Sequence, residues 1–458
     1  MSAHKLQAAV ERVDLASLAR LAFFLYFFLV FFGTDIPHSG RYDETGQMAA
    51  SNVVNQVAFS SLYLLAFLSV ANQLGRFLRF FLREKFLSLF LLWAFLSIFW
   101  SAFPLVSFKR WVQIFGAALI FTAFFLNTDS PKDGWKYLRA VAFAYVAVTI
   151  ISILFWSEAW DPQFPGSWRG LAPQKNQLGQ LMVISIVAAV SGIKTGSGPG
   201  KWISAAFLAA SVILLLGTRS MTAILVFLFL AGLAAVFYLG KLLGSQSIAR
   251  FLAGSFLIIG AVSLAMAQWI DSDFLARIFE LLGKDTTFSS RTLLWQSMLA
   301  RIAGHPVLGC GYGAFWVEGS RTLLFMHEEF IWRPIQAHNG YLDILNETGA
   351  VGLFLVVVMI GAYFIRVRKT SEASFYLWLV LASLINNVQE SSLFRLNEAM
   401  GVVFTLGYLA LFAAQQQELQ SGAAATSAEP PIPKRDATRR GENSISDKID
   451  GLQPLPSD

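Results

Sequence analysis

The sequence has a single cysteine and few charged residues. One thiol, Cys310, among 458 residues excludes an internal disulfide and is compatible with any redox compartment. Charged residues make up 14% of the chain against 55% hydrophobic residues, and the mean hydropathy is +0.56. This composition is too apolar for a soluble domain of that length, so it indicates a polytopic membrane protein.

Long apolar runs recur along the whole chain. A hydrocarbon core of about 30 Å requires about 20 apolar residues for each helical crossing. We therefore predict an all-α, polytopic helical membrane protein with about 12 transmembrane helices. The predicted spans are residues 18–36, 52–74, 85–103, 110–126, 138–156, 176–193, 202–217, 220–239, 250–270, 349–366, 374–391 and 398–415.

The charge pattern orients these spans. The segment "GTDIPHSG" after the first run lacks a cleavage site of small residues, so we expect an uncleaved anchor. Basic residues concentrate in alternate short connections, which the positive-inside rule assigns to the cytoplasm together with both termini. The predicted organisation is a cytoplasmic segment at 1–17 and a transmembrane domain at 18–415, which includes a long helical periplasmic loop at 271–348. The net charge of +6 then reflects topology and not binding of nucleic acid.

The chain after residue 415 is polar and rich in Pro, Ser, Ala and charge. Because it has too few apolar residues to fold, we predict a disordered cytoplasmic tail at 416–458. Its basic residues could bind a partner, but a solvated tail is the favoured interpretation. Internal repeats are not visible in the sequence, which weakens the case for a carrier built from inverted repeats.

Histidines gather on the predicted outer side of the membrane, which indicates an outward-facing site. His338 precedes a short predicted helix, and Gly349 allows that helix to bend before the next crossing. At the start of the helix, His338 could serve as a general base toward a hydroxyl group. A hydrogen-bonded interfacial histidine is the alternative, and position alone favours it. The outward histidines are His38, His305, His327 and His338, and the polar face of the helix carries Asn339, Asp343 and Glu347.

Several cations also fall on the predicted outer side. Arg219 lies in a turn between two apolar spans, where a cation is costly unless it is paired or reaches the headgroups. Arg291 is expected in the first turn of a helix, where a cation opposes the helix dipole and suggests an anionic partner. Salt bridges or solvation could satisfy each of these residues singly. Convergence near His338, together with Arg169 and Lys175, would instead suit a diphosphate.

Glycines and aromatic residues mark the same outer side. The stretch "LGCGYGAFW" is not a nucleotide-binding loop, because it lacks a βαβ unit and lies outside the cell on this topology. It indicates a turn in which the backbone closely approaches a ligand or another segment. Aromatic residues could stack on sugar rings there, although such residues more often form an interfacial belt. These residues are Trp160, Phe164, Trp168, Trp316, Trp332 and Tyr341.

Three stretches, in order, carry a resemblance to a known family. They read "LGTRSMTAIL", "SSRTLLWQSMLARIAGHPVLGCGYGAF" and "AHNGYLDILNETGAVGLFL". Together they resemble the signature region of the O-antigen ligase and polymerase superfamily, which includes the Wzy-type polymerases of bacterial exopolysaccharides. The upstream stretch "GLAPQKNQLGQ" is similar to a lysine–asparagine element of the same family, so the resemblance covers residues 169–365.

The resemblance implies a GT-C-like, metal-independent membrane glycosyltransferase of the bacterial inner membrane. Its substrate would be an undecaprenyl-diphosphate-linked oligosaccharide bound at the periplasmic face, with no cofactor. The family's diphosphate-binding arginine carries over onto Arg219, with Arg291 as a second candidate, and its catalytic histidine onto His338. Other partners would be membrane lipids and, in the same pathway, a chain-length regulator and a flippase. The candidate substrate-binding residues are Arg169, Lys175, Asn176, Asn339, Tyr341 and Trp316.

Several functional alternatives stay open. A polymerase and a ligase differ only in the acceptor, and we favour the polymerase because "WSAFP" with "SFKRW" and "PQKNQLG" resemble exopolysaccharide polymerases. A polysaccharide or lipid transporter would need charged or broken segments at the bilayer midplane, whereas most spans are clean apolar runs. A scaffold would need no chemistry at His338. The stretch "MHEEF" with His338 could form a weak metal site, although no HExxH motif demands a metal.

Overall fold

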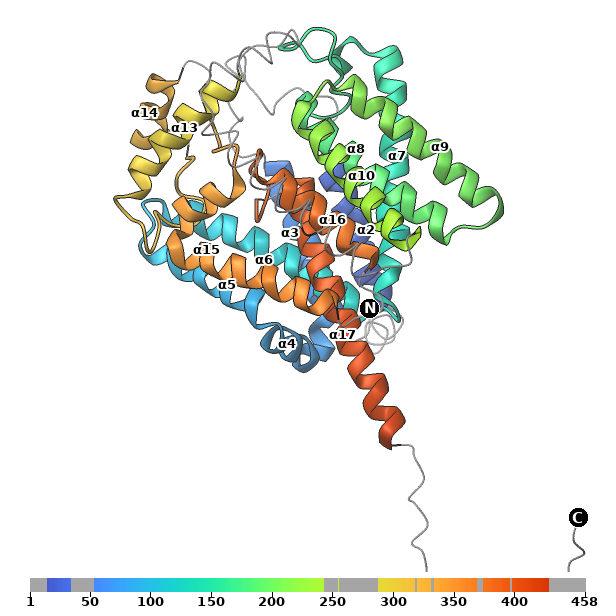
Figure 1. The fold of residues 1–458 in the computed structure, drawn as a ribbon. Coiled ribbons are helices and arrows are strands. Elements are labelled where there is room, and N and C mark those ends of the chain that lie inside the picture. The colour runs from blue at the N-terminus through green and yellow to red at the C-terminus, as the bar shows by residue number, and fades with distance from the viewer. Residues whose placement is uncertain are drawn as a thin grey trace, which may run out of the picture. The chain divides into compact units, whose positions relative to one another are not determined.

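Every regular element is a helix in the part of the chain that the computed structural model describes (Figure 1). This part comprises residues 15–33, 53–242, 254, 287–317, 319–330, 333–368, 374–395 and 398–427. Within it, extended pairing is limited to an isolated bridge between Trp160 and Trp168. The chain divides into two units, residues 1–416 and 417–458, and the candidate site lies in the first. The predicted all-α class is confirmed.

The helices follow the order of the apolar runs. Short 3₁₀ turns, η1 to η4, connect some of them. The α-helices are α2 (Leu15–Phe32), α3 (Val53–Val70), α4 (Leu74–Arg83), α5 (Lys85–Leu96), α6 (Pro104–Leu126), α7 (Gly134–Phe155), α8 (Lys175–Thr195), α9 (Gly198–Gly217), α10 (Met221–Leu242), α13 (Thr287–Ile302), α14 (Arg321–Glu329), α15 (Gly340–Val367), α16 (Ser374–Asn386) and α17 (Ala399–Ser427).

The described residues contain nine helices that are long and apolar enough to cross a membrane. Two shorter apolar helices, Lys85–Phe99 and Tyr376–Asn386, occupy the predicted spans 85–103 and 374–391. Apart from Gly254, which is helical, the predicted span 250–270 lies outside the described residues. The number and hydropathy of these helices support a multi-pass membrane protein.

Two helix boundaries correct the predicted ones. Helix α6 begins at Pro104 and not near residue 110, because proline has a fixed φ that suits the first helical turn. Helix α17 continues to Ser427, so residues 416–427 are helical and the predicted disordered tail began too early. This segment is rich in Ala and Gln, which favour helix even without an apolar face. Residues 428–458 lie outside the described part.

Aromatic side chains form much of the core between the N-terminal helices and α6. Phe23 of α2 stacks on Phe124 of α6 with ring centroids 3.9 Å apart, and Tyr26 meets Phe121 edge to face at 5.7 Å. All four rings are buried. Burial of such large rings and their offset or edge contacts stabilises helix packing where lipid supplies no hydrophobic driving force between helices.

Helix α15 bends at Gly349, as the sequence predicts. Gly349 has φ +68° and ψ −175°, a backbone conformation that is essentially confined to glycine. The break leaves carbonyl groups of the preceding turn without partners inside the helix. Backbone N–H groups of residues 308–316, here called the glycine loop, donate to these carbonyl groups. Cys310 N–H donates to the Asn346 carbonyl and Gly311 N–H to the Glu347 carbonyl, both at 3.0 Å. The predicted close backbone approach of "LGCGYGAFW" is thus confirmed, with α15 as its partner.

Replacing Gly349 with alanine should destabilise the protein by at least about 1–3 kcal/mol through backbone strain alone. A Cβ there would also lie 2.0 Å from the Val307 carbonyl oxygen, so the glycine loop would have to move. The matched control is Gly361→Ala on the same helix, where a Cβ meets nothing within 4 Å. Thermal unfolding in detergent should show a lower Tm for Gly349→Ala only, and equal Tm values for the two variants would contradict this account.

Candidate functional site

Glu390 is the centre of a polar cluster that joins segments far apart in the sequence. It follows α16, and its side chain is only 5% exposed. One carboxylate oxygen, Oε2, lies 2.9 Å from Nδ1 of His338, and the other, Oε1, lies 3.2 Å from Nη2 of Arg291. Arg291 also donates from Nη1 to the Gln389 carbonyl at 2.8 Å. The histidine and one predicted arginine therefore meet on a carboxylate that the sequence reasoning did not single out.

Helix α8 contributes to the same cluster from its first turn. Asn176 Nδ2 donates to Oε1 of Glu390 at 3.1 Å, and Asn176 Oδ1 accepts from the Ser220 hydroxyl at 2.8 Å. Gln336 Nε2 donates to Oε2 of Glu390 at 3.4 Å. The carboxylate thus receives donors from four side chains, as a buried charge requires.

The charge state of Glu390 follows from these neighbours. Burial raises the pKa of its carboxyl group, but His338 and Arg291 outweigh burial and hold the pKa below its usual value. Glu390 is therefore an anion at neutral pH. The carboxylate accepts a hydrogen bond from the Nδ1–H group of His338. In the neutral form of the imidazole, this tautomer has its lone pair on Nε2. This is the tautomer that a general base needs.

The backbone around His338 is tightly specified. His338 has φ +49°, which a residue other than glycine adopts at an energetic cost. Its neighbours anchor it to the segment that carries Glu390: Asn339 N–H donates to the Ser391 hydroxyl at 3.2 Å and Gly340 N–H to the Asn387 carbonyl at 2.8 Å. Strain that is held in this way is common at functional sites and suggests that the position of the imidazole matters.

Three of the predicted substrate-binding residues make contacts within the protein. Asn339 caps α15, because its Oδ1 accepts from the N–H groups of Tyr341 and Leu342 at 3.1 Å. Tyr341 donates its hydroxyl to the Leu384 carbonyl at 2.9 Å. Trp316 is 6% exposed and its indole N–H donates to Asp343 at 2.7 Å. Trp316 therefore has little surface left for stacking on a sugar.

Arg219 lies at the turn between α9 and α10 and, like His338, has a positive φ, +50°. Its side chain is exposed and passes close to Gly166, where an added Cβ would come within 3.0 Å of Nη1. The structure records no ion pair for Arg219 among the residues that it describes. Because Ser220 hydrogen-bonds Asn176, the Arg219 turn is linked to the Glu390 cluster through one side chain.

Arg169 and Lys175 belong to the segment between α7 and α8, with Lys175 as the first residue of α8. Arg169 donates from Nε to the Glu158 carbonyl at 2.7 Å, so much of its side chain holds the loop together. The ammonium of Lys175 lies 3.6 Å from the centre of the Phe164 ring, a cation–π contact. Asp161 accepts from the Lys175 N–H at 3.0 Å, which caps the start of α8.

Comparison with known proteins gives this arrangement a context. Residues 205–357 match a family described as O-antigen ligase. This segment is therefore similar to the O-antigen ligase family. The chain is also 29% identical over 299 residues to the exopolysaccharide production protein ExoQ of Rhizobium meliloti, a match that covers 61% of this chain and 64% of that protein, under two thirds of its length. A protein of Rickettsia felis provisionally named a polysaccharide ligase is 23% identical over 293 residues, covering 63% of this chain and 69% of that protein. These matches confirm the resemblance to the O-antigen ligase and polymerase superfamily.

The matched segment, residues 205–357, contains Arg219, Arg291 and His338, whereas Asn176 precedes it and Glu390 follows it. Glu390 was missed because it stands at the end of an apolar run. The signal that could have found it is the polar stretch "NNVQESS" at the C-terminal end of a predicted span. Asn387 orders that stretch, since its Oδ1 accepts from the N–H groups of Ser392 at 3.0 Å and Leu393 at 2.7 Å.

Two further predictions need correction. Helix α13 begins at Thr287, so Arg291 lies in its second turn and not its first, and the anionic partner suspected for it is Glu390. The weak metal site imagined for "MHEEF" with His338 does not form: among the described residues no group of three or more His, Cys, Asp or Glu side chains gathers. Glu329 instead accepts from the Ser297 hydroxyl at 2.7 Å.

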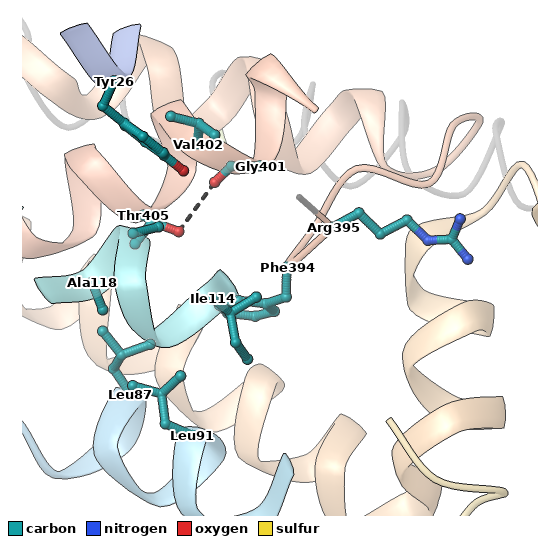
Figure 2. A pocket seen from close by; sticks show the side chains of 11 residues that line it. Tyr26, Leu87, Leu91, Ile114, Ala118, Phe394, Arg395, Gly401, Val402 and Thr405 are labelled. Atoms are coloured by element: carbon teal, nitrogen blue, oxygen red, sulfur yellow. Dashed lines mark hydrogen bonds between the residues drawn. The ribbon is translucent and has the colours of Figure 1, made fainter. Parts of the chain in front are cut away.

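A small cavity lies nearby but is not a sugar site. Figure 2 shows it beside Phe394 and Thr405, with the Arg395 side chain pointing away from it. Its volume is about 20 Å³, which is room for about one water molecule. The polar cluster at Glu390 is therefore the better candidate for chemistry.

Proposed function

We propose that this protein is a glycosyltransferase that polymerises undecaprenyl-diphosphate-linked oligosaccharide repeat units at the periplasmic face of the bacterial inner membrane. The observation that carries the proposal is the joining of His338 and Arg291 by the Glu390 carboxylate, with Asn176 on the same oxygen as Arg291. The name of the Rhizobium relative, an exopolysaccharide production protein, agrees with a polymer-forming role.

The chemistry is a single displacement at the anomeric carbon. Nε2 of His338 takes the proton of an acceptor sugar hydroxyl, whose oxygen forms a new bond to the anomeric carbon of the growing chain. The bond from that carbon to the lipid diphosphate breaks, and its electron pair leaves with the diphosphate. Direct displacement inverts the anomeric configuration.

Arg219 and Arg291 are the cations that would stabilise the diphosphate leaving group. Arg219 is exposed and has no recorded ion pair among the described residues, so it is available to meet a diphosphate. Arg291 is partly neutralised by Glu390 and serves both to fix that carboxylate and to add positive charge beside the reacting atoms. Preorganised cations act where negative charge develops, so they favour departure of the diphosphate in the transition state.

An O-antigen ligase is the second candidate, because the family segment and the Rickettsia relative both carry ligase names. The chemistry would be the same, with a lipid A-core sugar or another acceptor in place of the next repeat unit. The test uses purified full-length protein in nanodiscs with lipid-linked repeat units, and it resolves products by length. A ladder of longer lipid-linked chains supports the polymerase. Transfer only after addition of lipid A-core supports the ligase, and no transfer under either condition overturns both.

Replacing Arg219 with asparagine should lower the transfer rate by about 10²–10³-fold, the usual effect of removing one donor to a developing charge. Asparagine tolerates a positive φ, so the turn keeps its backbone and only the charge is lost. Arg219→Lys should retain part of the rate. The matched control is Arg321→Asn, an exposed arginine on α14. The measurement is the steady-state transfer rate with lipid-linked substrate. Equal losses of rate in Arg219→Asn and Arg321→Asn would contradict a role of Arg219 in binding the diphosphate.

A further inference from the structure

A second cavity lies among α8, α9, α10 and α16. Its volume is about 430 Å³, and most of its wall consists of aliphatic and aromatic side chains, with Trp378 from α16 among them. Engineered apolar cavities of about 150 Å³ stay dry and bind small apolar molecules, so a cavity of this size suits an apolar ligand. Ala231 and Ala234 of α10 line it and are also exposed, so it opens on the outer surface of the bundle.

The cavity is remote from the Glu390 cluster. Helix α8 carries Asn176 in its first turn and Lys194 in its last. With a rise of 1.5 Å per residue these two positions lie about 27 Å apart, close to the thickness of a hydrocarbon core. The residues of α8 that line the cavity run from Val183 to Lys194, so it lies in the half of the membrane opposite the proposed reaction.

Positive charge collects at the far end of this cavity. Ser191 and Lys194 are polar members of its wall, and none of the described residues that line it is acidic. Arg139 of α7 lies alongside, since its Nη1 donates to the Thr195 hydroxyl at 3.4 Å. Lys201 follows at the start of α9, and none of these three cations has an ion pair recorded among the described residues. A ligand with an apolar body and an anionic end matches this distribution.

We propose that this cavity binds an anionic phospholipid of the leaflet at the Lys194 end of α8. One acyl chain fills the apolar space between α8, α9 and α10, and the phosphate meets Lys194 with Arg139 close by. The exposed opening along α10 admits the chain from the bilayer. A free sugar or nucleotide does not fit, because the wall offers few hydrogen-bond donors or acceptors for its hydroxyl groups.

The positive charge at the Lys194 end of α8 also indicates which leaflet supplies the lipid. Helices α8 and α9 are joined by a connection of only residues 196–197, so Lys194 and Lys201 lie at the same membrane surface. Lys241 in the last turn of α10 reaches that surface too, because α9 and α10 are joined through the short turn at 218–220. Clusters of Lys and Arg beside a membrane attract anionic lipids. The site goes beyond the proposed sugar transfer and is independent of it.

The test uses full-length protein in phosphatidylcholine nanodiscs that contain phosphatidylglycerol with a diazirine midway along one acyl chain. After irradiation, labelled peptides are mapped by mass spectrometry. We expect adducts on the lining segments of α8, α9 and α10. Ala234→Leu, which narrows the cavity, should reduce them at least about fivefold. Lys194→Gln should reduce them about threefold, since the phosphate loses its cation.

The matched control is Ala235→Leu, an exposed neighbour that does not line the cavity and should leave labelling unchanged. Equal labelling by the same diazirine on phosphatidylcholine would overturn the preference for an anionic headgroup. Competition by the lipid-linked diphosphate would mean that the occupant is the substrate's own chain and would likewise overturn the proposal. Because labelling requires no glycosyl transfer, failure of the proposed function would leave this test intact.

Discussion

Replacing His338 with asparagine should lower the rate of glycosyl transfer by about 10²–10⁴-fold, the usual contribution of a general base. Asparagine accepts the positive φ of this position, and its side-chain amide can donate to Glu390 as the imidazole Nδ1 does. The substitution therefore keeps the backbone and the carboxylate contact and removes only the basic Nε2. The rate at saturating substrate should fall with little change in KM, as measured with purified protein and lipid-linked repeat units.

The control for this experiment is His327→Asn, a histidine of α14 that makes no recorded contact with Glu390. Glu390→Gln separates the orienting role from the base, because it leaves His338 in place without an anionic partner. Its rate should fall about 10–100-fold, the usual cost of losing a group that orients a reactive imidazole. If His338→Asn retained the wild-type rate while Glu390→Gln lost activity, the base would have to be sought elsewhere around Glu390.

The fold was largely predictable because apolar length is a local property of the sequence. Runs such as 176–193 and 220–239 needed only the thickness of the bilayer to be recognised, and α8 and α10 occupy them. The bend of α15 was equally local, since Gly349 stands between a polar turn and an apolar run. Boundaries were less predictable because caps and propensities extend helices beyond the apolar run, as α6 and α17 show.

The site was only partly predictable because its contacts join residues far apart in the chain. His338 and Arg291 were found from local features, a polar helix start and a cation near a helix N-terminus. Glu390, which joins them, is 52 residues from His338 and 99 from Arg291, so no local pattern linked the three. Trp316 shows what an aromatic residue in the sequence leaves undetermined. Its predicted role was stacking on a sugar, and the structure adds that its indole N–H is paired with the buried Asp343.

A second ion network explains how the glycine loop at residues 308–316 is held against α15. Nη2 of Arg395 lies 2.9 Å from Oδ2 of Asp343 and 3.7 Å from Oε1 of Glu347. The other Glu347 oxygen accepts from the Gly313 N–H at 2.9 Å. Burial lowers the pKa of Arg395, but the two carboxylates outweigh burial and raise it. Arg395 is therefore the cation in ion-pair contact with both buried acidic side chains, and Arg110 is a second positive charge that acts on them.

Replacing Arg395 with methionine should destabilise the protein by about 3–5 kcal/mol, the usual cost of removing one partner from a buried ion pair. Asp343 and Glu347 are 3% and 6% exposed, so water cannot replace the lost cation. The midpoint of thermal unfolding in detergent should fall clearly below the wild-type value. The difference should narrow as the pH is lowered, because a protonated carboxyl group needs no cation.

Two companion variants make this result specific. Arg321→Met removes an exposed arginine of α14 and should leave the unfolding midpoint unchanged. Adding Asp343→Asn to Arg395→Met should recover part of the lost stability, because the neutral amide no longer requires a counter-ion while it can still accept from the Trp316 indole. If the double variant were no more stable than Arg395→Met, the network would act through packing and not through charge. The position of the glycine loop would then depend on its backbone hydrogen bonds to α15 at the bend of Gly349.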